Sequence, residues 1–300
     1  MTSRDRIGIA VSLAFAALVI ACQGDPQGPD FTPVPGVTGK LAYVYSGSTR
    51  SELRVLDLRT GGTRTIYTPS SSSELLTSIA WHPDGHSLVM TTGSLGPGLF
   101  RLRKLNEDGT GLTPVFDADG AEFSAAYSPQ GSLAYCAQLS VTDPNDPVVA
   151  GLFVDGALVW QGVCHGGGHP SWFPDGSAVA LIGNCGVVFG GLCRVDVTPK
   201  TATPILAAPS SGVFTGGTAV SPQGDVIAVD AADQNGSAVW LIQADGSGTT
   251  MLPNGYDAQW SPDGSRILFV RGARLHVREM GTGAVTKIAD TEMSTIAWYP

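Results

Sequence analysis

The chain has 300 residues and a formal net charge of −9 at pH 7, with 17 Lys and Arg against 26 Asp and Glu. The positive residues form no cluster, which argues against a nucleic acid partner because phosphate binding requires concentrated Lys and Arg. Charged residues make up 14% of the chain, whereas 39 Gly and 20 Pro are present. This composition is typical of many short strands joined by tight turns.

Residues 1–21 predict a secretory signal peptide, which is not part of the fold. Arg4 and Arg6 form a positive n-region, and Ile7–Ala21 follows as an apolar and small-residue run of 15 residues. This run is shorter than the roughly 20 residues that a membrane-spanning helix needs, and it fits the apolar region of a signal peptide.

Cys22 stands directly after the apolar run, in the sequence Val19-Ile20-Ala21-Cys22. This sequence resembles the lipobox of bacterial lipoproteins. The resemblance implies cleavage before Cys22 and lipid attached to its sulfur and amino group. Several acyl chains anchor a protein stably, whereas one alone binds only marginally. We therefore expect an exported protein on the cell envelope, at the periplasmic face of the outer membrane or at the cell surface. The alternative is ordinary signal cleavage, which leaves Cys22 an unmodified thiol.

Residues 22–39 lie between the lipid attachment site and the repeats. They are rich in Pro and Gly and show no hydrophobic periodicity. Such a composition predicts a disordered tether. The remaining residues, 40–300, are a normal size for one all-β domain.

One turn recurs along residues 40–300. Its prolines lie 46, 45, 48, 40 and 38 residues apart. The five full copies and the sixth, which the C-terminus cuts short, are Trp81–Gly85, Tyr127–Gly131, Trp172–Gly176, Val220–Gly224, Trp260–Gly264 and Trp298–Pro300. A period near forty with an aromatic-x-Pro-Asp-Gly turn predicts a β-propeller, with one blade per repeat.

Each repeat divides into four short strands, A to D. In one repeat, Ser78–Trp81 leads into the turn as strand A, Leu88–Met90 is the apolar strand B, and Leu99–Leu102 is the alternating strand C. The chain begins on a strand B, Leu41–Tyr45, and ends on a strand A, Thr295–Trp298. We therefore predict a six-bladed ring in which the C-terminal strand completes the first blade, so that no edge is left unpaired at the seam.

These repeats resemble the TolB-type, WD40-like propeller family, whose repeat reads roughly Trp-Ser-Pro-Asp-Gly, an apolar strand, an alternating strand and an Asp-x-Gly turn. The resemblance covers essentially everything after residue 40, and it is specific for the fold and weak for function. Gln130 and Gln223 replace the Asp in two repeats, and Val220 replaces the aromatic residue in one. TolB carries a further domain before its propeller, where this chain has only the short tether. We therefore do not expect the cell-envelope role of TolB to carry over.

Four cysteines follow Cys22: Cys136, Cys164, Cys185 and Cys193. An even number in an exported protein favours disulfides. Cys185 and Cys193 flank a short loop that returns on itself, so we expect them to pair and Cys136 to pair with Cys164. Spacing alone leaves all three pairings open.

The two faces of a propeller carry different connections. The A–B and C–D turns share one face and are mostly short here, whereas the B–C and D–A loops share the other face and are irregular. Loops held by a rigid scaffold often carry function, so we expect this second face to bind the partner. The candidate partner-binding residues are Asp143, Asn145, Asp146, His165 and His169. The alternative is that these loops are merely tolerated insertions.

Neither a metal nor another cofactor is expected. Cys164, His165 and His169 form the only cluster of ligand-like residues, but no fourth ligand is close in sequence, and Cys164 is expected to be in a disulfide. Asp143, Asn145 and Asp146 do not form an Asp-x-Asp-x-Asp-Gly calcium loop.

The sequence has no Gly-x-Ser-x-Gly, Gly-x-x-x-x-Gly-Lys or His-Glu-x-x-His motif. This absence, together with the expected lipid anchor and the propeller, favours a non-catalytic binding or scaffold module whose partner is an envelope protein or a cell-wall component. We expect the protein to be monomeric. The alternative is an enzyme that acts on carbohydrate or peptide at the central channel. Its candidate residues would be Asp143, Asp146, His165 and His169.

Overall fold

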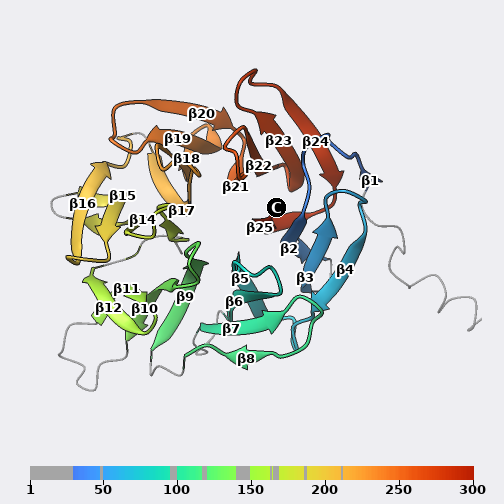
Figure 1. Ribbon diagram of the computed structural model, residues 1–300, viewed down its shortest axis with the longest axis horizontal. Helices are drawn as coiled ribbons and strands as arrows, with labels where there is room; N and C mark the ends of the chain where they lie inside the picture. The colour runs from blue at the N-terminus through green and yellow to red at the C-terminus, as the bar shows by residue number, and fades with distance from the viewer. Residues whose placement is uncertain are drawn as a thin grey trace, which may run out of the picture.

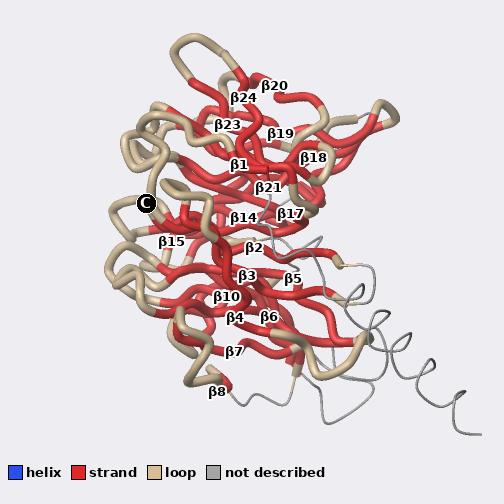
Figure 2. Tube along the Cα trace, turned by 90° about the vertical axis from the view of Figure 1, so that its right-hand side faces the viewer, coloured by secondary structure: helices blue, strands red, loops and turns tan. Residues whose placement is uncertain are grey.

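The computed structural model is a ring of six antiparallel sheets around a central axis (Figure 1). It describes residues 30–47, 50–94, 100–116, 120–139, 149–162, 164, 169–185, 188–210 and 212–300. In the side view, the strands fill the middle of the molecule and loops project from both faces (Figure 2). Across these ranges, no helix is long and apolar enough to cross a membrane. The predicted all-β, six-bladed propeller is confirmed.

Each blade consists of four strands that run in order from the central axis outwards. The first three blades are β25 (Met293–Tyr299), β2 (Lys40–Ser46), β3 (Ser51–Asp57) and β4 (Thr63–Tyr67); β5 (Glu74–Trp81), β6 (Ser87–Ser94), β7 (Arg101–Asn106) and β8 (Thr113–Pro114); and β9 (Ala121–Tyr127), β10 (Leu133–Leu139), β11 (Val149–Val154) and β12 (Ala157–Gln161). The last three are β13 (Ser171–Trp172), β14 (Ala178–Cys185), β15 (Val188–Asp196) and β16 (Thr201–Leu206); β17 (Gly212–Val220), β18 (Val226–Asp233), β19 (Gly236–Gln243) and β20 (Thr249–Pro253); and β21 (Tyr256–Trp260), β22 (Arg266–Arg271), β23 (Arg274–Glu279) and β24 (Val285–Asp290), to which β1 (Asp30–Phe31) adds a fifth strand.

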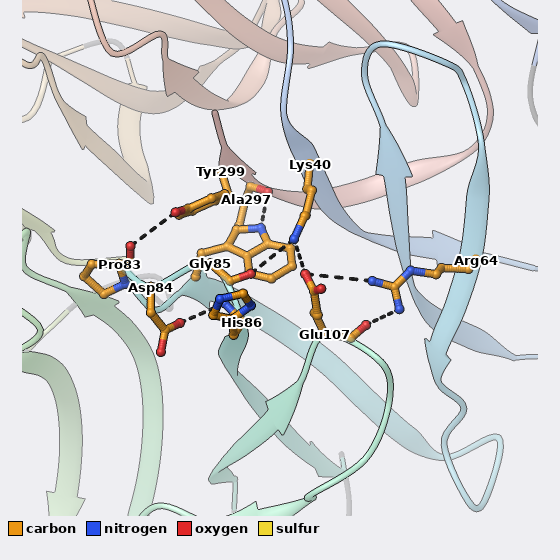
Figure 3. Close-up of polar contacts among 10 residues, drawn as sticks. Lys40, Arg64, Pro83, Asp84, Gly85, His86, Glu107, Ala297 and Tyr299 are labelled. Carbon is orange, nitrogen blue, oxygen red and sulfur yellow. Dashed lines mark hydrogen bonds and ion pairs between the residues drawn. The ribbon is translucent and has the colours of Figure 1, made fainter.

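The C-terminal strand closes the ring, as the order of the repeats predicts. β25 pairs with β2, and Trp298 lies opposite Leu41 in the register. Side chains then join this first blade to the second. The Tyr299 hydroxyl donates to the Pro83 carbonyl at 3.3 Å, and Lys40 forms an ion pair with Glu107 (Figure 3). The seam is therefore a continuous sheet with polar contacts across the blade interface.

The repeated turn shows what Gln contributes in one of the two copies where it replaces Asp. In an ordinary copy, the Asp263 carboxylate accepts the Ser265 N–H at 3.0 Å within its own turn. Gln223 instead reaches the next blade, where its side-chain amide donates to the Asp263 carbonyl at 3.1 Å. The longer side chain exchanges a contact within the turn for one between blades.

The core lies between neighbouring blades, and the tryptophans of strand A bridge these interfaces. Their indole N–H groups donate to backbone carbonyls of the preceding blade: Trp81 to Ala297 at 3.1 Å, Trp172 to Ala126 at 3.0 Å and Trp260 to Ala219 at 3.0 Å. Val220 has no such group. There the interface is joined by its backbone N–H, which donates to the Ser171 hydroxyl at 2.9 Å.

Part of the segment expected to be a tether lies on the propeller. β1 pairs with the outer strand of the sixth blade, and the Thr32 N–H donates to the Ile288 carbonyl at 2.8 Å. Val37 is buried, and Phe31 and Val34 pack against the same core cluster. These apolar side chains hold residues 30–39 against the ring. The sequence predicts a disordered tether up to residue 39, whereas the structure places residues 30–39 on the propeller. Residues 22–29 lie outside the described residues.

Candidate functional site: the central cavity

A cavity of about 550 Å³ lies on the central axis of the ring. Every blade contributes to its lining, for example Thr295, Thr77, Ser124, His169, Gly217 and Asp257 from the first to the sixth blade. Such a volume lies within the roughly 300–1,000 Å³ of typical small-molecule sites. The central cavity therefore has the dimensions of a binding site.

Bulges in the inner strands form the wall of the central cavity. The register of β9 on β10 shifts at Ser124, and that of β21 on β22 shifts at Asp257. Both residues have a φ of 54°, in the left-handed region that bulges often use. The bulge at Asp257 lies at the start of β21, and that at Ser124 lies in the middle of β9. Ala121, Tyr256 and Ser294 also line the cavity and stand at or next to the start of their strands, away from the Pro-x-Gly turns at the strand ends. The central cavity thus lies toward the face of the B–C and D–A loops.

Two acidic side chains meet in the central cavity, of which Asp257 is buried and Asp230 is partly buried. The Asp257 N–H donates to both carboxylate oxygens of Asp230 at 2.9 Å, and Asp257 Oδ2 accepts the Ile296 N–H at 2.5 Å. Burial raises the pKa of Asp230 to about 7. Burial, reinforced by the charge of Asp230, raises the pKa of Asp257 well above its ordinary value. The pair therefore holds a proton at neutral pH.

His169 connects three blades around the central cavity. Its N–H donates to the Gly216 carbonyl at 3.0 Å, and its own carbonyl accepts the Thr218 hydroxyl. Burial lowers the pKa of the imidazole to about 4, against the opposing effect of a hydrogen bond to the Thr77 backbone. The ring is therefore neutral at physiological pH.

Of the candidate partner-binding residues, only His169 is placed by the structure, and it lines the central cavity. Asp143, Asn145, Asp146 and His165 lie outside the described residues. Their role in partner binding, and that of His169, stays a proposal.

Both expected disulfides are present. Cys136 of β10 pairs with Cys164, with their Cα atoms 6.3 Å apart, and Cys185 pairs with Cys193 across the β14–β15 hairpin at 6.1 Å. Cys164 lines the central cavity, so the first bond fixes part of its wall. It also removes the Cys164 thiolate as a metal ligand. The described part of the chain contains no group of three or more His, Cys, Asp or Glu that could hold a metal ion.

Sequence reasoning missed Asp230 and Asp257, although the repeat contains a signal for Asp257. The residue five positions before each repeat proline lines the central cavity in five blades: Ser124, His169, Gly217, Asp257 and Thr295. An alignment of the repeats on their prolines would have found this ring of positions. Asp230 belongs to β18, the second strand of its blade, and not to the innermost strand. In the sequence, the one sign that Asp230 is unusual is that it is an acid within an apolar run.

No protein-family model and no curated protein sequence matches the chain. Solved structures of similar fold include TolB from Acinetobacter baumannii, which is 18% identical with a TM-score of 0.63 over 100% of this chain and 74% of that one. A putative TolB from Agrobacterium tumefaciens is 17% identical, with a TM-score of 0.58 over 88% and 100% of the two chains. An oligogalacturonate lyase in complex with manganese is 14% identical, with a TM-score of 0.53 over 84% and 74%. These similarities identify the chain as a six-bladed propeller of the fold found in TolB proteins and in some enzymes.

Proposed function

We propose that the chain is a non-catalytic binding module of the cell envelope. It is exported, anchored by lipid on Cys22, and binds an envelope protein or a cell-wall component at the central cavity and the loops around it. The observation that carries this proposal is the cavity of about 550 Å³, which all six blades line on the face of the irregular loops. A closed ring holds such a wall rigid, and preorganisation of this kind favours binding.

Two further observations support the proposal. The disulfides Cys136–Cys164 and Cys185–Cys193 are typical of exported proteins. Solved TolB structures share the fold, which is compatible with a binding module.

A substitution that fills the central cavity and leaves the rest of the ring unchanged tests this proposal. Thr215 is exposed and lines the cavity, so Thr215→Trp should block it without disturbing the core. Thr249→Trp makes the same change at an exposed position on the outermost strand of the same blade. The tagged, lipidated protein would be cross-linked mildly in its own envelope, and captured partners would be identified by mass spectrometry.

We expect a reproducible envelope partner that Thr215→Trp loses and Thr249→Trp retains. Replacement of loops 140–147 and 163–169 should also weaken capture. Capture that is equal for both Trp variants would exclude the central cavity as the binding site.

A second candidate function is an enzyme acting on carbohydrate or peptide at the central cavity. The observation that favours it is the pair of Asp230 and Asp257, because a carboxyl with a pKa near 7 can act as a general acid. Solved structures of similar fold also include a puromycin hydrolase and prolyl endopeptidases. Turnover of oligogalacturonides or peptide arylamides that is lost in Asp257→Asn would support the enzyme. Binding without turnover would support the module.

A further inference from the structure

We propose that Asp230 and Asp257 bind the head group of an organic cation, an alkylammonium or an alkylguanidinium, in the central cavity. This inference rests on the proposed function, because it names the chemistry of a ligand for the same cavity.

Asp257 has one carboxylate oxygen that is available to a ligand in the central cavity. Asp257 is only 8% exposed, and its Oδ2 accepts the Ile296 N–H. Its Oδ1 accepts no hydrogen bond from the described residues, although the side chain lines the central cavity. Both oxygens of Asp230 share the single N–H of Asp257. The two carboxyl groups thus accept hydrogen bonds from only two backbone N–H groups of the described residues, although each carboxyl group can accept several.

The described lining of the central cavity has no positive charge to pair with the two carboxyl groups. Among the described residues, no Lys or Arg lines the central cavity, and the imidazole of His169 is neutral. A buried carboxylate is stable only when it is paired with a cation or carries a proton. The chain supplies no cation here, so a ligand can supply it.

The size and the lining of the central cavity suit an organic cation. A cavity of about 550 Å³ is much larger than a bare metal ion, and the described residues provide no three-ligand metal site. Phe100, Phe123 and Tyr256 also line it. Aromatic faces attract organic cations and pack against apolar stems. The combination fits a cationic head group on an alkyl stem.

Binding of a cation should be coupled to the protonation of the pair. Among the described residues, the other titratable groups that line the central cavity are Tyr256 from β21 and His169 from the fourth blade. The pKa of Tyr256 is raised by burial and by the two carboxylates, so Tyr256 stays neutral, as His169 does. The proton that a cation displaces must therefore come from Asp230 and Asp257. Affinity should rise between pH 5 and pH 8, with release of a proton.

The experiment is isothermal titration of the mature full-length protein in detergent micelles. The probes are n-butylamine and n-butylguanidine, with n-butanol as the neutral analogue, calcium chloride alone, and Nα-acetyl-lysine N-methylamide as a mimic of a protein side chain. Buffers of different ionisation enthalpy report the released proton.

Asp257→Asn is the principal variant, because Asn has nearly the same shape and tolerates the φ of 54° at this position. Asp230→Asn is the second. Asp233→Asn is the matched control, since Asp233 is an exposed acid on the same strand as Asp230. We expect saturable binding of a cationic probe that either cavity variant weakens at least about tenfold, the effect of one hydrogen bond to a charged group. Asp233→Asn should leave it unchanged.

The pattern of probes identifies the source of the cation. Binding of n-butylamine or n-butylguanidine alone supports a free small molecule, and preference for the lysine mimic supports a basic side chain of a partner. Equal binding of n-butanol, displacement of the amine by calcium, no binding of any cation, or unchanged binding in both cavity variants would overturn the proposal. Partner capture that Thr215→Trp blocks would survive such a result, so the two proposals can fail separately.

Discussion

Asp257 illustrates how one residue sets the chemistry of the central cavity. It occupies a bulge of β21 with a φ of 54°, where its N–H donates to Asp230 and its carboxyl accepts from Ile296. These three residues belong to the sixth, fifth and first blades. The same contacts that join the blades therefore place two acidic groups side by side in the central cavity. The folded state should be less stable at high pH, where both groups lose their protons.

The buried pair should make stability depend on pH. The pKa of Asp230 is raised from 3.8 to about 7, so between these values the folded chain keeps a proton that the unfolded chain has lost. Stability therefore falls as pH rises from about 4 to about 7. Asp230→Asn removes the contribution of Asp230 to this dependence, while the contribution of buried Asp257 remains. The variant should therefore be more stable than the parent at pH 8 by a few kcal/mol, since each pKa unit corresponds to about 1.4 kcal/mol. Urea unfolding at pH 4, 6 and 8 measures it.

The control for this prediction is Asp233→Asn, at the exposed end of the same strand. It should follow the pH profile of the parent. An Asp230→Asn variant that loses as much stability as the parent between pH 4 and pH 8 would contradict the raised pKa.

The tryptophans of strand A give a second prediction at this scale. The Trp81 indole donates to the Ala297 carbonyl in a buried contact, whereas Trp298 donates to the Thr38 carbonyl in an exposed one. Trp81→Phe leaves a buried carbonyl without a partner and should cost about 2 kcal/mol or more, while water replaces the donor in Trp298→Phe and limits the loss to about 1 kcal/mol. Chemical denaturation of both variants tests this order. Equal losses would show that the indole contact does not stabilise the blade interface.

At the scale of strands and their connections, the two disulfides differ in the length of chain that they close. Cys136 and Cys164 are 28 residues apart, and Cys185 and Cys193 only 8. Replacement of each pair by Ser should cost about 3.5 and about 2.5 kcal/mol respectively in the chain-entropy account. Urea unfolding of the two double variants measures the difference. A larger loss for the short loop would mean that native packing, rather than loop closure, dominates.

The closing strand gives the other prediction at this scale. Deletion of residues 293–300 removes β25, so that Leu41 and Tyr43 of β2, both fully buried, lose their neighbours. The loss of Met293 and Ile296 alone should cost at least about 4 kcal/mol, since each large buried side chain contributes about 2–5 kcal/mol. Thermal unfolding followed by circular dichroism tests this. Removal of Pro300 alone, which leaves β25 intact, is the control, and an unchanged midpoint in the longer deletion would refute a role for closure.

Across the whole molecule, features that repeat along the chain could be predicted from the sequence. Contacts between segments that are distant in sequence could not be predicted. Six turns at a period near forty, with a strand order that starts at B and ends at A, were enough to predict the ring and its closure. The pairing of Asp230 with Asp257 joins two blades. The repeat position of Asp257 and the acid within the apolar run of β18 mark each residue separately, but neither pattern shows that the two side chains meet. The attachment of Phe31 is similar, because β1 has two residues and is held by tertiary packing alone.

The attachment of β1 also sets how far the proposed lipid anchor can lie from the ring. Residues 23–30 are the eight that lead from Cys22 to the first residue of β1. Eight residues span about 28 Å at full extension, at roughly 3.3–3.6 Å each. β1 pairs with the outer strand of the sixth blade, and the third blade lies on the opposite side of the ring (Figure 1). A lipidated chain should therefore keep the rim of the sixth blade closer to the membrane than that of the third.

Fluorescent labels at two exposed outer-strand positions test this geometry. In liposomes that contain an acceptor dye, energy transfer should be stronger from Thr286→Cys on β24 of the sixth blade than from Ala157→Cys on β12 of the third. Cys22→Ser removes the lipid attachment site and should abolish transfer from both while the protein moves to the aqueous phase of a detergent partition. Equal transfer from the two labels in the lipidated protein would mean that the anchor does not hold the ring by the rim of the sixth blade. Retention of Cys22→Ser on the membrane would refute lipid anchoring at Cys22 itself.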